Sequence, residues 1–311
     1  MAKKIELALI AGGKSGERDV SLAGASGVSA ALDKGRYNVR QYDPAIDLAR
    51  LADDAPGLDV AFILLHGPLG EDGAMQGFLD LLGLPYQGSG ILGSALAMDK
   101  DRAKKAYVEA GLPVAPWRLA KAGQSFDQAA CCAELGLPLV IKPLSQGSSL
   151  GMAIVQQESE LAAALEDAFK YGDEVMVEAF IKGREITGGV LGNARPEPLP
   201  LVEIIPGADY PFFDYQAKYT KGASEEICPA QVSDDIRQRA QDYALRAHDA
   251  LGLKGYSRTD MMVDASGNIY VIETNTIPGM TPTSLLPQAA RAHGLEFAQF
   301  IDRLIELAME S

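Results

Sequence analysis

The chain has 311 residues, of which 47% are hydrophobic and 23% charged, values typical of a globular protein of two or three domains. Its net charge of −14 disfavours nucleic acid as a partner, because such binding needs a cationic surface. No apolar run approaches the roughly 20 residues of a membrane helix, and three cysteines, two of them adjacent, cannot build a disulfide framework. We therefore expect an enzyme of the reducing cytoplasm that neither spans nor binds a membrane.

Residues 1–94 form the first expected domain. Residues 5–11 predict a strand that ends at two glycines, and residues 20–32 predict a helix. Residues 58–66 predict a buried strand, followed by a loop over 67–73 and a helix over 74–82. Two such strand–loop–helix units predict parallel strands in an open sheet.

Two further domains are expected, 95–182 and 183–311, with a boundary near Ser94. The second begins with a polar, lysine-rich helix over 97–110 and continues with strands over 139–142, 151–155 and 174–178 and a helix over 158–169. The third contains an irregular segment over 207–229, a long helix over 233–251, strands over 256–263 and 269–273, and a helix from residue 296. The expected fold class is α/β (α+β).

Two neighbouring strands near the C-terminus carry polar side chains at alternating positions. Arg258 and Asp260 share one face of the first strand, and Glu273 and Asn275 share one face of the second. If these strands pair, three oxygen ligands meet beside one guanidinium, and Mg²⁺ prefers such ligands. A surface hairpin with scattered polar residues is the alternative.

A glycine- and serine-rich turn over 142–151 joins two predicted strands. Its small residues would let backbone N–H groups approach a phosphate. It is not a P-loop, since a strand follows it and no Gly-Lys-Ser/Thr sequence ends it. A plain hairpin turn also explains the glycines, but not Lys142 inside an apolar strand, where a charge needs a partner.

Residues 12–21 lie where the first strand turns into a helix. The Gly-x-Gly-x-x-Gly spacing of dinucleotide-binding folds is absent here. Glu17 lies near the helix N-terminus, where a carboxylate is stabilised by the helix dipole, so a capping role is the alternative to a functional one.

Taken together, six segments closely resemble, in the same order, the D-alanine:D-alanine ligases of the ATP-grasp superfamily. They are residues 13–21 (Gly-Lys-Ser-Gly-Glu-Arg-Asp-Val-Ser), 65–67 with 70–73 (Leu-His-Gly and Gly-Glu-Asp-Gly), 98–100 (Met-Asp-Lys), 142–143 with 147–151 (Lys-Pro and Gly-Ser-Ser-Leu-Gly), 255–260 (Gly-Tyr-Ser-Arg-Thr-Asp) and 273–281 (Glu-Thr-Asn-Thr-Ile-Pro-Gly-Met-Thr).

The resemblance implies an ATP-grasp fold, in which two domains clasp ATP and an N-terminal α/β domain completes the amino-acid site. It implies phosphate contacts by Lys100, Lys142, Ser149 and Lys218, adenine contacts by Glu178, Ala179 and Ile181, and ribose contacts by Glu185. Two Mg²⁺ ions, or Mn²⁺ in their place, would be held by Asp260, Glu273 and Asn275.

The resemblance also implies roles in binding the two D-alanine molecules. Glu17 would pair with the ammonium of the first, with His66 nearby, while Arg258 and the Gly279 N–H would stabilise the oxyanion, and Ser284 would bind the carboxylate of the second. Ser148 and Tyr219 would join Glu17 in closing a mobile loop over 207–229, and Tyr219 favours D-alanine over D-lactate as the acceptor.

The implied activity is ATP-dependent ligation of two D-alanine molecules through a D-alanyl phosphate, with release of ADP and phosphate, for the synthesis of peptidoglycan precursors by a homodimer. One alternative is another ATP-grasp ligase that joins a different acid and amine. A second alternative is a nucleotide-binding regulator without catalytic activity, against which the presence of Arg258, Asp260, Glu273 and Asn275 argues.

Overall fold

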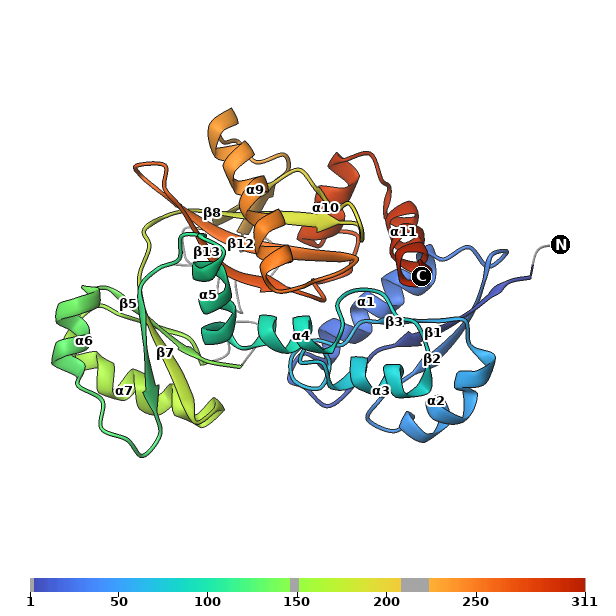
Figure 1. Cartoon of the computed structure of the whole chain (residues 1–311), viewed down its shortest axis with the longest axis horizontal. Coiled ribbons are helices and arrows are strands. Elements are labelled where there is room, and N and C mark those ends of the chain that lie inside the picture. Colours follow the sequence, from blue (N-terminus) through green and yellow to red (C-terminus); the bar gives the residue numbers. More distant parts are fainter. Residues whose placement is uncertain (1–2, 146–150, 208–223, 311) are drawn as a thin grey trace.

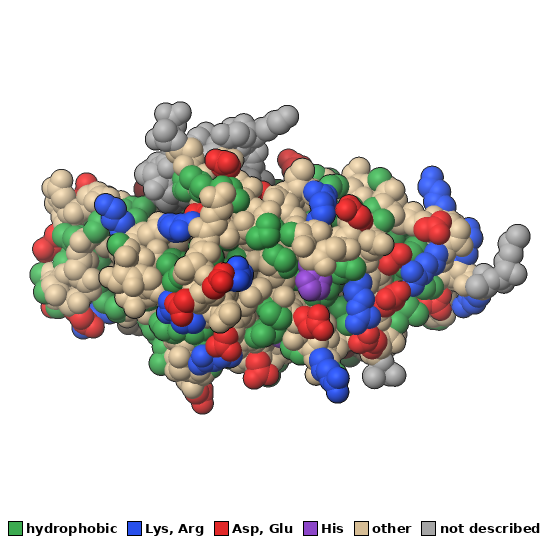
Figure 2. All heavy atoms as spheres, turned by 90° about the horizontal axis from the view of Figure 1, so that it is seen from above, with side chains coloured by type: hydrophobic (Ala, Val, Ile, Leu, Met, Phe, Trp, Pro, Cys, Tyr) green, Lys and Arg blue, Asp and Glu red, His purple; other side chains and the backbone are tan. Residues whose placement is uncertain are grey.

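The computed structural model describes residues 3–145, 151–207 and 224–310, in which three β-sheets follow one another along the chain (Figure 1). On the face shown in Figure 2, acidic and basic side chains are mixed, with hydrophobic side chains between them. Among the described helices, none combines the length and the apolar character needed to cross a membrane.

The N-terminal sheet is parallel, as the strand–loop–helix units predict. Its order is β2–β1–β3, with β1 (Ile5–Ile10) between β2 (Tyr37–Tyr42) and β3 (Val60–Ile63). The helices of this part are α1 (Arg18–Ala31), α2 (Leu48–Asp54), α3 (Ala74–Leu82) and α4 (Ile91–Met98), with a 3₁₀ turn η1 (Ala55–Gly57) after α2. Because the strands are parallel, the loops that follow β1 and β3 leave the same edge of the sheet, where ligands bind in open α/β folds.

The central sheet is antiparallel and has the order β4–β7–β5–β6. Its strands are β4 (Trp117–Lys121), β5 (Leu139–Pro143), β6 (Ala153–Val155) and β7 (Glu174–Ala179). Two helices, α6 (Gln128–Leu135) and α7 (Glu158–Ala168), together with a 3₁₀ turn η2 (Phe169–Tyr171), accompany it. Leu161 and Leu165 of α7 pack in one core with Ile141 and Val177 of the sheet.

The C-terminal sheet is also antiparallel, in the order β11–β10–β8–β12–β13, with β9 paired to β8. Its strands are β8 (Gly183–Leu191), β9 (Glu197–Pro198), β10 (Val202–Pro206), β11 (Ser224–Ile227), β12 (Tyr256–Asp264) and β13 (Ile269–Asn275). The helices are α9 (Asp234–Ala250), α10 (Leu285–Ala292) and α11 (Phe297–Met309). Phe300 and Ile301 of α11 pack against Leu7, Leu9 and Phe62, so the first and last parts of the chain share one core.

Two element predictions are wrong in detail. The single helix expected over 97–110 is interrupted at Asp99, which has an extended backbone (ψ 105°) and whose side chain accepts hydrogen bonds from the N–H groups of Asp101 and Arg102. Asp99 thereby begins a separate helix, α5 (Lys100–Glu109). The segment expected to be irregular over 207–229 contains β11, and its residues 208–223 lie outside the described part of the chain.

Candidate functional site

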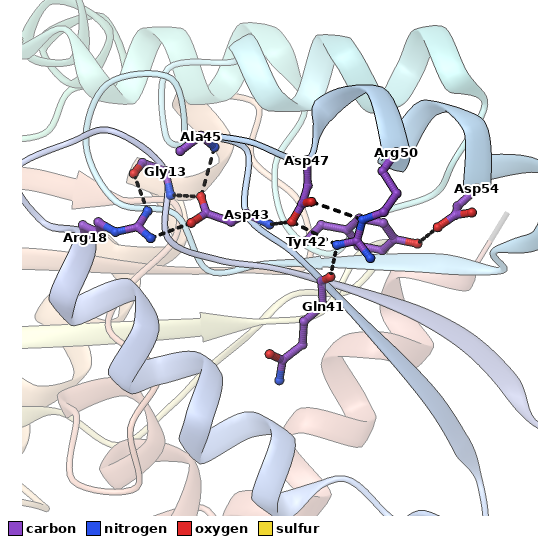
Figure 3. A network of polar contacts seen from close by, with 9 residues as sticks. All are labelled: Gly13, Arg18, Gln41, Tyr42, Asp43, Ala45, Asp47, Arg50 and Asp54. Atoms are coloured by element: carbon purple, nitrogen blue, oxygen red, sulfur yellow. Dashed lines mark hydrogen bonds and ion pairs between the residues drawn. The ribbon is translucent and has the colours of Figure 1, made fainter.

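The loop after β1 is held by a network of polar contacts (Figure 3). Arg18 donates from Nη1 to the Gly13 carbonyl (2.7 Å) and from Nη2 to Asp43 Oδ2 (2.6 Å), while Asp43 Oδ1 accepts from the Gly13 N–H (2.9 Å). The adjacent Arg18 guanidinium lowers the pKa of Asp43 to about 2. Gly12 and Gly13 both have positive φ angles, which glycine adopts without strain. The network therefore fixes the loop that leads to Glu17.

Glu17 is the N-cap residue of α1, but its side chain makes no capping hydrogen bond. Its carboxylate lies against Gly67, where a Cβ would come within 2.8 Å of Glu17 Oε2. Glu17 and His66 are both buried, and burial lowers the pKa of His66 to about 4, which leaves the imidazole neutral at pH 7. The loops after β1 and β3 thus bring Glu17 and His66 together.

Glu71 belongs to the same group, although no role was expected for it. Its Oε2 accepts from the Gly67 N–H (2.7 Å). Burial raises the pKa of Glu71 to about 8, and the nearby charge of Glu17 contributes to the shift. At pH 7 Glu71 is therefore mainly protonated, and Glu17 supplies the negative charge that suits an ammonium group. The sequence signal for Glu71 is the Gly-Glu-Asp-Gly segment after His66, because a carboxylate in a short loop flanked by glycines lies close to the backbone.

The pairing of β12 with β13 gathers the expected metal-binding side chains. Arg258 faces Asn275, and Asp260 faces Glu273 across the two strands. Asp260 is only 6% exposed, which contradicts the alternative of a surface hairpin. Its carboxylate accepts from Arg258 Nε (2.9 Å) and Nη2 (2.8 Å), from Asn275 Nδ2 (3.2 Å) and from Thr187 Oγ1 (2.6 Å).

The donor chemistry of this group fits a hard cation. Among the described residues no cluster of three or more His, Cys, Asp and Glu side chains suits a metal ion. Asp260 and Glu273 are two carboxylates and Asn275 adds an amide oxygen, which is the set that Mg²⁺ uses when phosphate oxygens of a substrate complete its shell. We infer that a cation would bind here together with a phosphorylated ligand.

Lys142 has the partner that a charge in an apolar strand requires. Its Nζ donates to Glu178 Oε2 (2.6 Å), and Glu178 is buried. Burial alone would lower the pKa of Lys142, but the carboxylates of Glu178, Glu273 and Glu185 outweigh it and raise that pKa. Lys142 therefore lies within electrostatic range of Glu273 on β13 and of Glu185 on β8.

Two lysines of α5 lie beside the same carboxylates, Glu273 and Glu178. Lys100, at the start of α5, lies with its Nζ 3.7 Å from Glu273 Oε2. Lys104, four residues further on, forms an ion pair with Glu178 and was not expected to have a role. Ala179 ends β7, where its N–H donates to the Pro116 carbonyl (3.0 Å), and Ile181 lies in the connection to β8.

The segment between β13 and α10 connects the metal-binding strands with the N-terminal loops. The backbone of Ile277 makes hydrogen bonds with the side chains of His66 and Glu71. Two residues further, a Cβ on Gly279 would lie 3.1 Å from Ser284 Oγ, which accepts from the Thr281 N–H (3.1 Å). Gly279 and Ser284 are therefore neighbours. The remaining expected site residues, Ser148, Ser149, Lys218 and Tyr219, lie outside the described residues.

Comparisons with known proteins agree with this arrangement. Residues 107–306 match the family described as D-ala D-ala ligase C-terminus, and residues 45–89 match D-ala D-ala ligase N-terminus. A D-alanine--D-alanine ligase of Desulfotalea psychrophila is 57% identical over 99% of this chain and 96% of its own length. A second, of Syntrophobacter fumaroxidans, is 57% identical over 99% of both chains.

Solved structures agree as well. The D-alanine--D-alanine ligase of Bacillus anthracis, complexed with ATP, has a TM-score of 0.86 and 34% identity, with 98% of this chain and 97% of that chain covered. The VanG D-Ala:D-Ser ligase of Enterococcus faecalis has a TM-score of 0.83 and 33% identity, with 98% and 100% covered. With nearly full-length similarity in sequence and in fold, the chain belongs to the D-alanine–D-alanine ligase family.

Proposed function

We propose that this chain joins two D-alanine molecules in an ATP-dependent reaction that supplies a peptidoglycan precursor. The observation that carries the proposal is the convergence of two groups. His66, which lies beside Glu17, is linked through Ile277 to the strands that carry Arg258 and Asp260. The proposal agrees with the names of the relatives and with the ATP bound to the Bacillus anthracis protein.

The chemistry requires activation of a carboxylate, because its negative charge repels an incoming amine. A carboxylate oxygen of the first D-alanine would attack the γ-phosphorus of ATP, which gives D-alanyl phosphate and ADP. The amine of the second D-alanine would then attack the acyl carbon, and phosphate would leave. Phosphoryl transfer depends mainly on positioning and charge neutralisation, which lysines and a cation can supply.

In this proposal each part of the site has one task. Glu17 and His66 would orient the first D-alanine through its ammonium group, and Ser284 would bind the carboxylate of the second. Arg258 and the Gly279 N–H would stabilise the tetrahedral oxyanion. Two Mg²⁺ ions, or Mn²⁺, held by Asp260, Glu273 and Asn275, would neutralise charge on the phosphate oxygens.

The nucleotide would be held by residues of the central sheet and of the C-terminal sheet. We propose phosphate contacts by Lys100, Lys142, Ser149 and Lys218, adenine contacts by Glu178, Ala179 and Ile181, and ribose contacts by Glu185. Ser148 and Tyr219 would join Glu17 in closing the loop over 207–229, which would keep water away from the acyl phosphate. The division into domains 1–94, 95–182 and 183–311 belongs to the same proposal.

The identity of the second substrate needs a direct test, because one similar structure is a D-Ala:D-Ser ligase. We propose D-alanine, on the basis of Tyr219 and of the 57% identical relatives named D-alanine--D-alanine ligase. Competition among D-alanine, D-serine and D-lactate at equal concentrations and neutral pH should give mainly D-alanyl-D-alanine. A product with mainly D-serine or D-lactate at the second position would reject this choice of acceptor.

We further propose that the protein is a cytoplasmic homodimer. Its three cysteines are free, which suits a reducing compartment. The N-terminal part exposes large apolar side chains, among them Ile46 (82%), Leu81 (88%) and Leu92 (71%), and exposed apolar surface of this kind is often covered by a partner. Light scattering on the purified protein should give twice the mass of the chain.

The activity is tested with purified protein, ATP, Mg²⁺ and D-alanine. The expected result is one ADP and one D-alanyl-D-alanine per turnover, with no dipeptide when L-alanine replaces D-alanine. Release of ADP that depends on another amino acid would favour the alternative ligase. Binding of ATP without any amino-acid-dependent release of ADP would favour the regulator.

A further inference from the structure

Lys104 of α5 is a buried cation in the interior of the molecule. Its side chain is 1% exposed, its ammonium pairs with Glu178 Oε1, and it lies 5.0 Å from the centre of the Trp117 ring. An ammonium group is costly to bury unless a counter-charge accompanies it. Glu178 supplies that charge, since its own side chain is equally buried.

Glu178 lies between two lysines that come from different elements. Its Oε1 pairs with Lys104 on α5, and its Oε2 accepts from Lys142 on β5 (2.6 Å). Two ammonium groups and one carboxylate leave the cluster with a formal charge of +1. Lys142 keeps some exposure of its side chain, whereas Lys104 is enclosed and cannot reach a ligand.

We propose that Lys104 is a positioning residue that acts through Glu178, sharing the carboxylate charge so that Lys142 is held less tightly and can bind a nucleotide phosphate. This role rests on the proposed nucleotide site. Without Lys104, the charge of Glu178 would fall entirely on Lys142, and the cluster would become neutral. Lys142 would then be held more tightly by Glu178 and would attract phosphate less.

The position of α5 supports this role, because the helix lies between the central sheet and the β12–β13 pair (Figure 1). Three residues of α5, spaced so that they share one face of the helix, contact the central sheet and strand β13. Lys100 Nζ lies 3.7 Å from Glu273 Oε2, Lys104 pairs with Glu178, and the Tyr107 hydroxyl donates to Thr274 Oγ1 (2.8 Å). One face of α5 thus ties the Glu178 carboxylate to the strand that carries a proposed metal ligand.

The electrostatic environment is consistent with a shared carboxylate. Burial alone would raise the pKa of Glu178, but Lys142 and Lys104 together lower it below its ordinary value. The carboxylate is therefore ionised at pH 7. Burial lowers the pKa of Lys104, and the charge of Glu178 opposes that shift.

The test is Lys104→Met, which keeps the length of the side chain and removes its charge while Glu178 retains Lys142 as a partner. Calorimetry with the β,γ-imido analogue of ATP and Mg²⁺ should show a roughly tenfold higher Kd. With saturating D-alanine, KM for ATP should rise by a similar factor while kcat stays within about threefold. Lys105→Met is the matched control, since Lys105 is on the same helix and 57% exposed; its Kd should stay within about twofold.

A double-mutant cycle separates this role from packing. In the Glu178→Gln background no carboxylate charge remains to be shared, so adding Lys104→Met should not weaken binding of the analogue further. Glu178→Gln alone should lower the unfolding temperature, because it leaves Lys104 buried without a counter-charge, and adding Lys104→Met should raise that temperature again. An equal loss of affinity in both backgrounds would mean that Lys104 only packs, and an unchanged Kd for Lys104→Met would reject its role outright.

A third variant distinguishes failure of this inference from failure of the nucleotide site. Lys142→Ala should weaken binding of the analogue. If Lys142→Ala binds the analogue with the same Kd as the unmodified protein, the proposed nucleotide site is wrong, and so is the proposed role of Lys104. If Lys142→Ala binds weakly while Lys104→Met is unchanged, only the role of Lys104 is rejected.

Discussion

At the residue scale, the proposed role of Arg258 in catalysis can be tested separately from nucleotide binding. Its guanidinium contacts the buried Asp260, which is itself a proposed metal ligand. If it stabilises the oxyanion, Arg258→Ala should lower kcat by ~10² to 10³ and leave the Kd of the ATP analogue within about threefold. Arg118→Ala is a suitable control, because Arg118 pairs with Glu134 on the surface of the central domain. Equal losses of turnover and of nucleotide binding would contradict the oxyanion role.

Asp43 provides a residue-scale prediction about pH. Its pKa falls from an ordinary value of 3.8 to about 2 in the folded protein. A carboxyl whose folded pKa is depressed stabilises the fold above its unfolded pKa, and this contribution is lost as pH falls from 3.8 through 2. Asp43→Asn should therefore lower the free energy of unfolding by roughly 2 kcal/mol at pH 7.

Denaturant unfolding of both proteins at pH 7, 5 and 3 checks this prediction. The difference between them should be the same at pH 7 and 5 and should shrink at pH 3. A difference that is constant down to pH 3 would show that the Asp43 carboxylate has an ordinary pKa, and that Arg18 does not stabilise it.

Not every residue of the site follows from the sequence. The grouping of Arg258, Asp260 and Asn275 is predictable, because side chains alternate along strands that a short turn joins. The pairing of Lys104 with Glu178 is not, since 74 residues separate them and no local pattern encodes the contact. The need of Lys142 for a partner is visible in the sequence, but the identity of that partner is not.

At the scale of elements, close packing on both sides of β8 explains why this central strand contains two adjacent glycines. A Cβ on Gly189 would lie 2.5 Å from Leu286 Cδ1, and a Cβ on Gly188 would lie 2.9 Å from Ala244 Cβ. Gly189→Ala should thus cost about 1 to 3 kcal/mol of stability through overpacking. Gly57→Ala is the matched control, because a Cβ there meets nothing within 4 Å. Equal unfolding midpoints for the two variants would refute this explanation.

Element prediction succeeded where periodicity was strong. Helix α3 begins and ends at the residues expected, and the helix expected over 158–169 matches α7 to within one residue. The strand β2 was not expected, because its polar residues alternate irregularly between partly and fully exposed positions. The break between α4 and α5 was missed, although Asp99 is a favourable N-cap residue and was a signal for it.

At the scale of the whole molecule, the two ends of the chain share one core, and the site lies where the three sheets come together. Helix α11 packs on the N-terminal sheet through Phe300 and Ile301, which brings β12 and β13 close to the loops after β1 and β3. Sequence reasoning predicted the parallel character of the N-terminal sheet. It did not predict that α10 and α11 complete the N-terminal core, because hydrophobic patterns identify which face is buried but not what covers it.

The central claim is that at one site phosphate is transferred from ATP to a D-alanine carboxylate and the acyl group is then transferred to a second D-alanine. The most direct test is to supply D-alanine labelled with ¹⁸O in both carboxylate oxygens and to analyse the products by mass spectrometry. If an acyl phosphate forms, each phosphate released carries one ¹⁸O atom from the first D-alanine for every dipeptide made. Phosphate without ¹⁸O, alongside labelled dipeptide, would contradict the mechanism.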